Sequence, residues 1–152
     1  MRKLTTIPKG AAILVLIAGF IGFADATYLS VLHFTNQIPN CFVLGGCELV
    51  TTSKYAVIAG VPMALLGAIY YLAVFVLSVA YLDSRKIVLM KIIGGFSVLS
   101  FLMSVTLVYL QLFVIHSICP YCMLSALTST TIFVTMLTVY WRSPKIIPDE
   151  KP

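Results

Sequence analysis

The sequence predicts an all-α protein, an integral membrane four-helix bundle with a cysteine-bearing outer loop between its first two helices. Three observations lead to this fold class: the composition, the length of the apolar runs and the placement of the basic residues. The 152 residues are 61% hydrophobic and only 10% charged, and the mean hydropathy is +1.06. Water-soluble domains carry about 25% charged residues. The composition therefore favours a membrane protein over a soluble globular class.

Four apolar runs are long enough to cross a bilayer. About 20 helical residues, each rising about 1.5 Å, cross a hydrocarbon core of about 30 Å. Backbone groups in lipid must be hydrogen-bonded within their own segment, which favours helices, and the alternating strands of a β-barrel are not visible. We expect one domain over residues 1–152 with spans at about 11–32, 61–82, 88–115 and 118–140.

The basic residues predict the orientation of these spans. Nine of the ten Lys and Arg residues fall on one side of a four-span arrangement, and Lys54 lies on the other. The positive-inside rule makes the crowded side cytoplasmic. We therefore expect a multi-pass protein of the cytoplasmic membrane with both termini inside. The same clustering argues against nucleic-acid binding as the reason for the net charge of +5.

The first run has an alternative interpretation as a cleavable signal peptide. Basic residues, an apolar stretch and the small residues "ADA" at Ala24–Ala26 imitate such a segment and its cleavage site. However, the apolar run continues to Leu32, and removal of the segment would leave only three spans. We therefore expect the run to be the first helix of the bundle.

Glycines occur within several of the predicted spans. Small residues let transmembrane helices approach closely. We expect this role for five of them, namely Gly19, Gly22, Gly67, Gly94 and Gly95.

All four cysteines fall on the predicted outer side. Cys41 and Cys47 lie in the first outer loop, and Cys119 and Cys122 lie at the outer end of the fourth run. The outer compartment is the one in which disulfides form and persist. Thiol–disulfide exchange proceeds through mixed disulfides, so two pairs on one face are able to pass electrons from one to the other.

The Cys-x-x-Cys pair has a helix-starting pattern. We expect Cys119 at the N-cap, Pro120 at the first helical position and Cys122 at the third, because proline suits a position whose N–H needs no partner. The helix dipole and free N–H groups there favour a thiolate. The spacing brings the two sulfurs close together.

Two interpretations compete with redox chemistry. Four outer cysteines also suit a non-enzymatic membrane protein, a transporter or assembly factor, that is held by two static disulfides. They also suit a zinc site completed by His33 or His116, although the five residues between Cys41 and Cys47 exceed the usual two to four. We expect no metal.

The combination of motifs resembles a known family. A spaced cysteine pair in the first outer loop is followed by "CELVTTSKY", by "GVPMALLGAIYY" and by the Cys-x-x-Cys that opens the fourth helix. This order resembles the vitamin K epoxide reductase family in its bacterial or archaeal form, from "ATYLSVLH" at Ala26–His33 to the end of helix four. The DsbB-type alternative has its two pairs in the reverse order.

The resemblance implies a fold and an activity. Family members are four-helix bundles around a quinone, and prokaryotic ones are functional analogues of DsbB. They would reoxidise a thioredoxin-like, DsbA-like partner and pass the electrons to ubiquinone or menaquinone, which supports disulfide formation outside the cytoplasm. Only "RSPKIIPDEKP" follows the last span, so we expect no fused thioredoxin domain and a separate partner.

The resemblance also implies residue roles. Cys41 and Cys47 would exchange with the partner, Cys119 would take electrons from them, and Cys122 would face the quinone. Ser53 matches a serine that helps to fold the loop over the quinone.

Two positions depart from the animal members of the family. Ala126 stands in place of their tyrosine, and Met63 falls near their asparagine. We therefore expect plain quinone reduction rather than vitamin K epoxide reduction.

Two polar residues within the spans are further candidates for quinone contact. Asp25 is the only acidic residue inside a predicted span, and a carboxylate is costly to bury there. It would deliver a proton to reduced quinone, or it faces a polar gap in the bundle. Gln111, in the outer half of the third span, has the same two interpretations.

Overall fold

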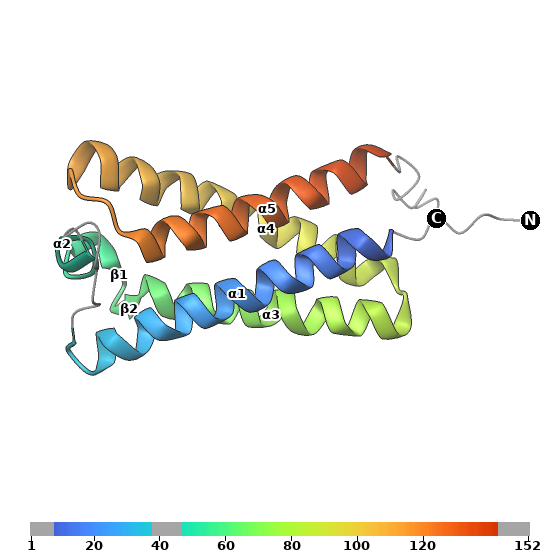
Figure 1. Cartoon of the computed structure of the whole chain (residues 1–152), viewed down its shortest axis with the longest axis horizontal. Coiled ribbons are helices and arrows are strands. Elements are labelled where there is room, and N and C mark those ends of the chain that lie inside the picture. Colours follow the sequence, from blue (N-terminus) through green and yellow to red (C-terminus); the bar gives the residue numbers. More distant parts are fainter. Residues whose placement is uncertain (1–7, 38–46, 143–152) are drawn as a thin grey trace, which may run out of the picture.

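A computed structural model describes residues 8–37 and 47–142, and four long helices make up most of it (Figure 1). All four are long and apolar enough to cross a membrane, and their ends lie within two residues of the predicted spans. The long helices are α1 (Lys9–Phe34), α3 (Met63–Ser84), α4 (Ile87–Tyr109) and α5 (Pro120–Arg142). The short elements are α2 (Cys47–Thr51), η1 (Lys54–Ala56), β1 (Val57–Ile58), β2 (Val61–Pro62) and the π-helix η2 (Leu110–Val114).

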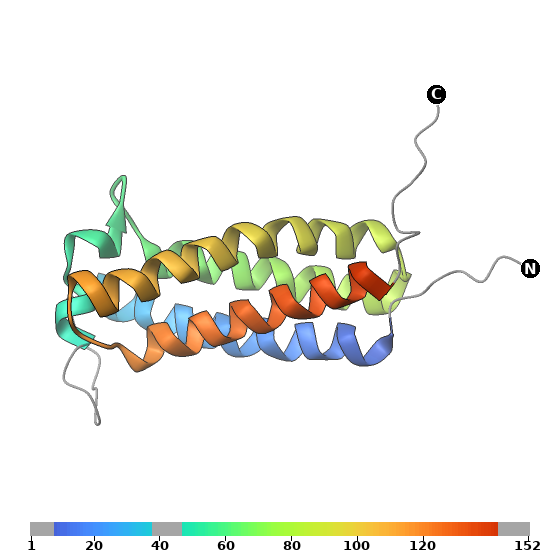
Figure 2. The same cartoon turned by 90° about the horizontal axis from the view of Figure 1, so that it is seen from above.

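The four long helices form an up-down-up-down bundle (Figures 1 and 2). α1 packs against α3 and α5, and α4 packs against the same two helices. Each helix therefore packs against two antiparallel neighbours, as in other up-down-up-down bundles. The short elements between α1 and α3 all lie at one end of the bundle, which we call the α2 end.

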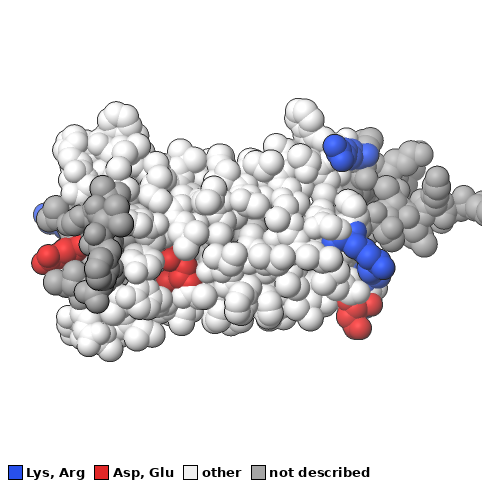
Figure 3. All heavy atoms as spheres, in the orientation of Figure 1, with Lys and Arg blue, Asp and Glu red and all other residues white. Residues whose placement is uncertain are grey.

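The charged residues separate the two ends. Among the described residues, five basic ones are at the end opposite α2, which we call the basic end: Lys9, Arg85, Lys86, Lys91 and Arg142. Figure 3 shows charged atoms at both ends and one acidic spot on the otherwise uncharged middle. This distribution is the one expected of a multi-pass membrane protein.

The buried side of α1 is a stripe of small and medium-sized residues. It runs along the helix at intervals of three and four residues through Ala12, Val15, Ala18, Gly22 and Ala26. The large apolar side chains of the bundle are mostly exposed, as Phe20, Leu99 and Leu102 illustrate. Such a surface is stable only in lipid, where apolar side chains need no cover.

The glycines fulfil their predicted role at three of the five positions. A Cβ on Gly22 would overlap the ring of Tyr71, and a Cβ on Gly19 would lie 3.2 Å from Val74. Gly67 faces Ala26 across the same α1–α3 contact. The prediction is wrong for Gly94 and Gly95, because no atom lies within 4 Å of a Cβ at either position.

A small antiparallel hairpin precedes α3 and was not predicted. Val57 pairs with Pro62 and Ile58 with Val61. The turn residues Ala59 and Gly60 both have positive φ, 52° and 82°, as a type I′ hairpin turn requires. The predicted span began at residue 61, but a residue before proline disfavours helix, so Val61 is extended and α3 begins at Met63.

Candidate active site

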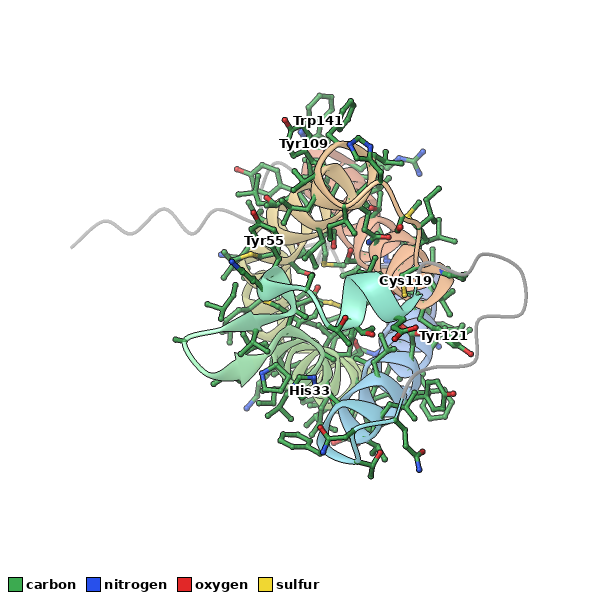
Figure 4. The ribbon with its side chains drawn as sticks, turned by 90° about the vertical axis from the view of Figure 1, so that its left-hand side faces the viewer. His33, Tyr55, Tyr109, Cys119, Tyr121 and Trp141 are labelled. Atoms are coloured by element: carbon green, nitrogen blue, oxygen red, sulfur yellow. The ribbon has the colours of Figure 1, made fainter. Side chains whose placement is uncertain are left out.

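Cys119 and Cys122 lie at the start of α5, at the α2 end of the bundle. α5 begins at Pro120, and the Cys119 carbonyl accepts the helix-type hydrogen bond of the Met123 N–H at 3.0 Å. Cys119 is thus the N-cap and Pro120 the first helical residue. The predicted start of the fourth helix is confirmed. Figure 4 looks onto this end, where Cys119 and Tyr121 lie at the start of α5 and α2 crosses in front of the helices.

The two thiols of this pair differ in their surroundings. Cys119 is fully buried, whereas Cys122 is partly buried and contacts a cavity. The Cys122 thiol donates a hydrogen bond to the Cys119 sulfur. This bond, helped by the backbone N–H groups of Cys122 and Tyr121, lowers the pKa of Cys119 from 9.0 to about 7 despite its burial. A thiolate is therefore stabilised at the N-terminus of α5.

A π-helical turn places Gln111 beneath the cysteine pair. The predicted third span is α-helical to Tyr109 and then continues as η2, where the Ile115 N–H bonds the Leu110 carbonyl at 2.8 Å. Gln111 is 2% exposed, and its Oε1 accepts a hydrogen bond from the Cys119 N–H at 3.0 Å. The N-cap residue of α5 is thereby tied to the end of α4.

A partly enclosed cavity lies beside the pair, within the α2 end of the bundle. It has an accessible volume of about 120 Å³. Its wall is mainly apolar and comes from all four long helices, with residues such as Leu29, Met63, Leu107 and Ala126. α2 and η1 contribute Val50, Thr51 and Tyr55 from the loop. An empty apolar cavity of about 150 Å³ holds a benzene ring, so this space is on the scale of one ring.

Asp25, Ser53, Gln111 and Cys122 all line this one cavity. The structure therefore brings together four of the seven residues predicted for the site, and Cys119 adjoins them through Gln111. Ser53 caps η1, and its hydroxyl donates to the Val50 carbonyl at 2.8 Å. That bond joins η1 to α2 and stabilises the fold of the loop next to the cavity.

Asp25 is a buried acidic residue of α1 on the wall of this cavity. Its side chain is 7% exposed, and neither carboxyl oxygen has a hydrogen-bond partner within the described part of the chain. The carboxyl is close enough to Cys119 and Cys122 for their charges to interact. Its place on the cavity wall, beside Gln111 and Ser53, agrees with both interpretations of Asp25, a quinone contact and a polar gap in the bundle.

The loop pair is described only in part. Cys47 is the first residue of α2, and Cys41 lies outside the described residues. The predicted exchange between the loop pair and the Cys119–Cys122 pair therefore stays a prediction. Among the described side chains, no three His, Cys, Asp or Glu groups come together as metal ligands.

Two tyrosine contacts at the site were not predicted. Tyr121, inside the Cys-x-x-Cys, packs on Tyr28 of α1 with ring centroids 5.3 Å apart. Tyr71 of α3 donates to the Ser125 carbonyl at 2.6 Å and bonds the Thr128 hydroxyl at 2.8 Å. They fix α5 to α1 and α3 next to the cavity. Nothing in the spacing of these tyrosines indicates the contacts, because they depend on how the helices are rotated.

Comparison with models of protein families gives a match that spans most of the chain, whereas the comparison with curated proteins found no match. The model of one protein family, described as the vitamin K epoxide reductase family, matches residues 13–137. The matched stretch contains both cysteine pairs and all the residues named above as lining the cavity.

Proposed function

Because the chain belongs to the vitamin K epoxide reductase family and is a membrane thiol–disulfide oxidoreductase, we propose that it reoxidises a thioredoxin-like partner and reduces a membrane quinone. The observation that carries the proposal is the position of Cys122 on the wall of an apolar cavity, hydrogen-bonded to the stabilised thiolate of Cys119. A thiol pair in this place has access to a lipid-soluble acceptor on one side and to the loop on the other.

The electrons pass through two disulfide exchanges and one oxidation. The dithiol of the partner breaks the Cys41–Cys47 disulfide through a mixed disulfide and becomes a disulfide itself. The loop dithiol then breaks the Cys119–Cys122 disulfide by attack on Cys119. Finally Cys119 and Cys122 give two electrons to quinone and re-form their bond. Each exchange breaks one sulfur–sulfur bond and makes one, so only the last step consumes oxidant.

The low pKa of Cys119 suits it to the exchange with the loop. A thiol of lower pKa is the better leaving group, and Cys119 leaves as a thiolate when the second loop cysteine resolves the mixed disulfide. Cys119 is fully buried, so a loop cysteine reaches it only after the side chains that cover it move. α2, which begins at Cys47, lies at the same end of the bundle.

The chemistry of the cavity fits a quinone head group. Its mainly apolar wall suits the ring, and among its polar groups are a carboxyl on α1 and an amide on η2. The Oε1 of Gln111 is held by Cys119, so its Nε2 is the free donor for a quinone oxygen. Asp25 and Ser53 line the same space. The volume of about 120 Å³ is filled by one ring, so the rest of a larger quinone would extend out of the partly enclosed cavity.

The side chains on the cavity wall do not favour reduction of vitamin K epoxide. Met63 and Ala126 both line the cavity, and neither carries a hydrogen-bonding side chain. The animal members of the family are expected to have an amide and a phenol at the corresponding places. Ubiquinone or menaquinone is therefore the proposed acceptor, with no metal involved.

The orientation in the membrane follows from the two ends of the bundle. We place the basic end, with both termini, in the cytoplasm and the α2 end, with all four cysteines, outside. The partner is then an extracytoplasmic, DsbA-like protein. The protein would supply oxidising equivalents for disulfide formation outside the cytoplasm.

Anaerobic reduction of a short-chain quinone by dithiothreitol tests the proposal. Wild-type protein in detergent should reduce the quinone rapidly, as followed by absorbance, and Cys122→Ala should lose the reaction. Ser84→Ala, an exposed position at the basic end, should match the wild type. Equal slow rates in wild type and Cys122→Ala would instead mean that the cysteines are structural or bind metal.

A further inference from the structure

We propose that Asp25 is the proton donor that completes the reduction of quinone in the cavity that its carboxyl lines. The inference rests on the proposed function and concerns the wall of the same cavity. The Asp25 side chain is only 7% exposed and lines the cavity. Its carboxyl has no hydrogen-bond partner among the described residues.

The surroundings of Asp25 favour its neutral form. None of the described Lys and Arg residues lines the cavity. A buried carboxylate without a cation or donor is costly, and in a membrane it either pairs or takes up a proton. Within the described chain, the titratable groups that act on Asp25 or are acted on by it are Cys119, Cys122 and Tyr121 of the α5 end and Tyr71 of α3. None of these is a cation. His33 of α1 also lines the cavity, two helical turns from Asp25, and neither carboxyl oxygen of Asp25 has a hydrogen-bond partner in the described part of the chain.

The proton count of the reaction leaves one proton unassigned. Reduction of a quinone to its hydroquinone takes two electrons and two protons. The reduced pair supplies two electrons but, with Cys119 as thiolate, only the one proton of Cys122. Asp25 supplies the other. Cys119 thiolate, Cys122 thiol and the Asp25 acid then become a disulfide and the Asp25 carboxylate, and one negative charge is present before and after.

The exchange with the loop returns the proton to Asp25. The two thiols of the loop pair carry two protons, and the reduced pair keeps only one of them, on Cys122. The other proton passes to the Asp25 carboxylate. The site therefore carries one negative charge throughout the catalytic cycle. The charge is on Cys119 when the pair is reduced and on Asp25 when the pair is oxidised.

The first test compares rates of quinone reduction. Removal of a positioned acid costs about 100-fold in rate, so Asp25→Asn should be slower by about that factor. Asp25→Glu should restore most of the rate, and Asp83→Asn, exposed near the basic end, should equal wild type. If wild type reduces no quinone, the proposed function fails. If Asp25→Asn reduces it as fast as wild type, only this inference fails.

Chemical rescue separates a proton donor from a structural residue. Asp25→Ala leaves room for a small acid in the cavity. Added acetic acid should raise its rate of quinone reduction in proportion to concentration, and acetamide, which has the same shape but no acidic proton, should not. Equal effects of the two compounds would overturn the assignment.

An infrared measurement needs neither quinone nor turnover. Dithiothreitol-reduced wild-type protein should show the carbonyl band of a protonated carboxylic acid. The band should vanish in Asp25→Asn and shift in Asp25→Glu. Wild-type protein without such a band would contradict the inference even if the variants fold poorly.

Discussion

Cys119 combines two properties that normally exclude one another. It is fully buried, which raises the pKa of a thiol, yet its pKa is lowered to about 7. The hydrogen bond from Cys122 is the largest cause, and the backbone N–H groups at the start of α5 add to it. The hydrogen bond from the neighbouring sulfur therefore offsets the effect of burial on the pKa of Cys119, and the thiolate form is stabilised at a side chain that is shielded from bulk solvent.

The reactivity of Cys119 should follow this pKa. The thiolate is the reacting form, so its modification rate should rise tenfold per pH unit below about pH 7 and level off above it. In Cys122→Ala the midpoint should move to higher pH, toward the ordinary 9.0. A small thiosulfonate reagent and mass spectrometry of the reduced protein measure both. An unchanged midpoint would mean that Cys122 does not stabilise the thiolate.

At the scale of elements, the site depends on how four helices are joined near the α2 end. η2 ends α4 with a π-helical turn, and such turns are frequent at functional sites. It holds Gln111 against the N-cap of α5, while Tyr71 ties α3 to α5. Tyr71 has room only because α1 carries Gly22 beside its ring. The packing of α1 on α3 therefore helps to fix the position of α5.

Two glycine substitutions test this packing as a matched pair. Gly22→Ala should force the Tyr71 ring to move and weaken its bonds to Ser125 and Thr128, at a cost of roughly 1–3 kcal/mol from overpacking. Gly94→Ala adds the same methyl group where no atom lies within 4 Å, so its stability should stay close to that of wild type. The midpoints of SDS-induced unfolding in mixed micelles give the comparison. Equal losses in both variants would contradict the packing argument.

At the scale of the whole molecule, charge and chemistry lie at opposite ends. The basic end holds most of the described cations, and the α2 end holds the Cys119–Cys122 pair, the cavity and the loop elements that line it. In the orientation that we propose, positive charge holds the basic end in the cytoplasm, and the α2 end meets the oxidising compartment. The surface charges would then decide which proteins the cysteines encounter.

Site-directed labelling tests this orientation. In a background with all four cysteines changed to alanine, Thr35→Cys lies at the α2 end and Ser84→Cys at the basic end, and both positions are exposed. A membrane-impermeant maleimide added to spheroplasts of an expression host should label Thr35→Cys alone. Detergent should then make Ser84→Cys reactive. Labelling of Ser84→Cys before detergent is added would reverse the proposed topology.

The sequence by itself determined the four spans, the separation of basic residues from cysteines and the start of α5 at Pro120. These features follow from local physics. The length of an apolar run determines whether it spans the bilayer. Positive charge determines which end of the bundle is cytoplasmic. A proline favours the first position of a helix. The π-helical turn at the end of the third span could not be predicted in this way. Its residues are as apolar as those of the α-helix before it, so composition does not distinguish the two.

Only the tertiary structure decided that Asp25, Gln111 and Cys122 share one cavity, and that Gly22 faces Tyr71 while Gly94 faces nothing. These relations depend on the rotation of each helix about its axis. In a soluble protein an apolar stripe reveals that rotation. Here apolar residues such as Phe20 and Leu102 face lipid while others face the core, so both sides of a span look alike. Rotation is set by the fit of side chains between helices, which a single sequence does not display.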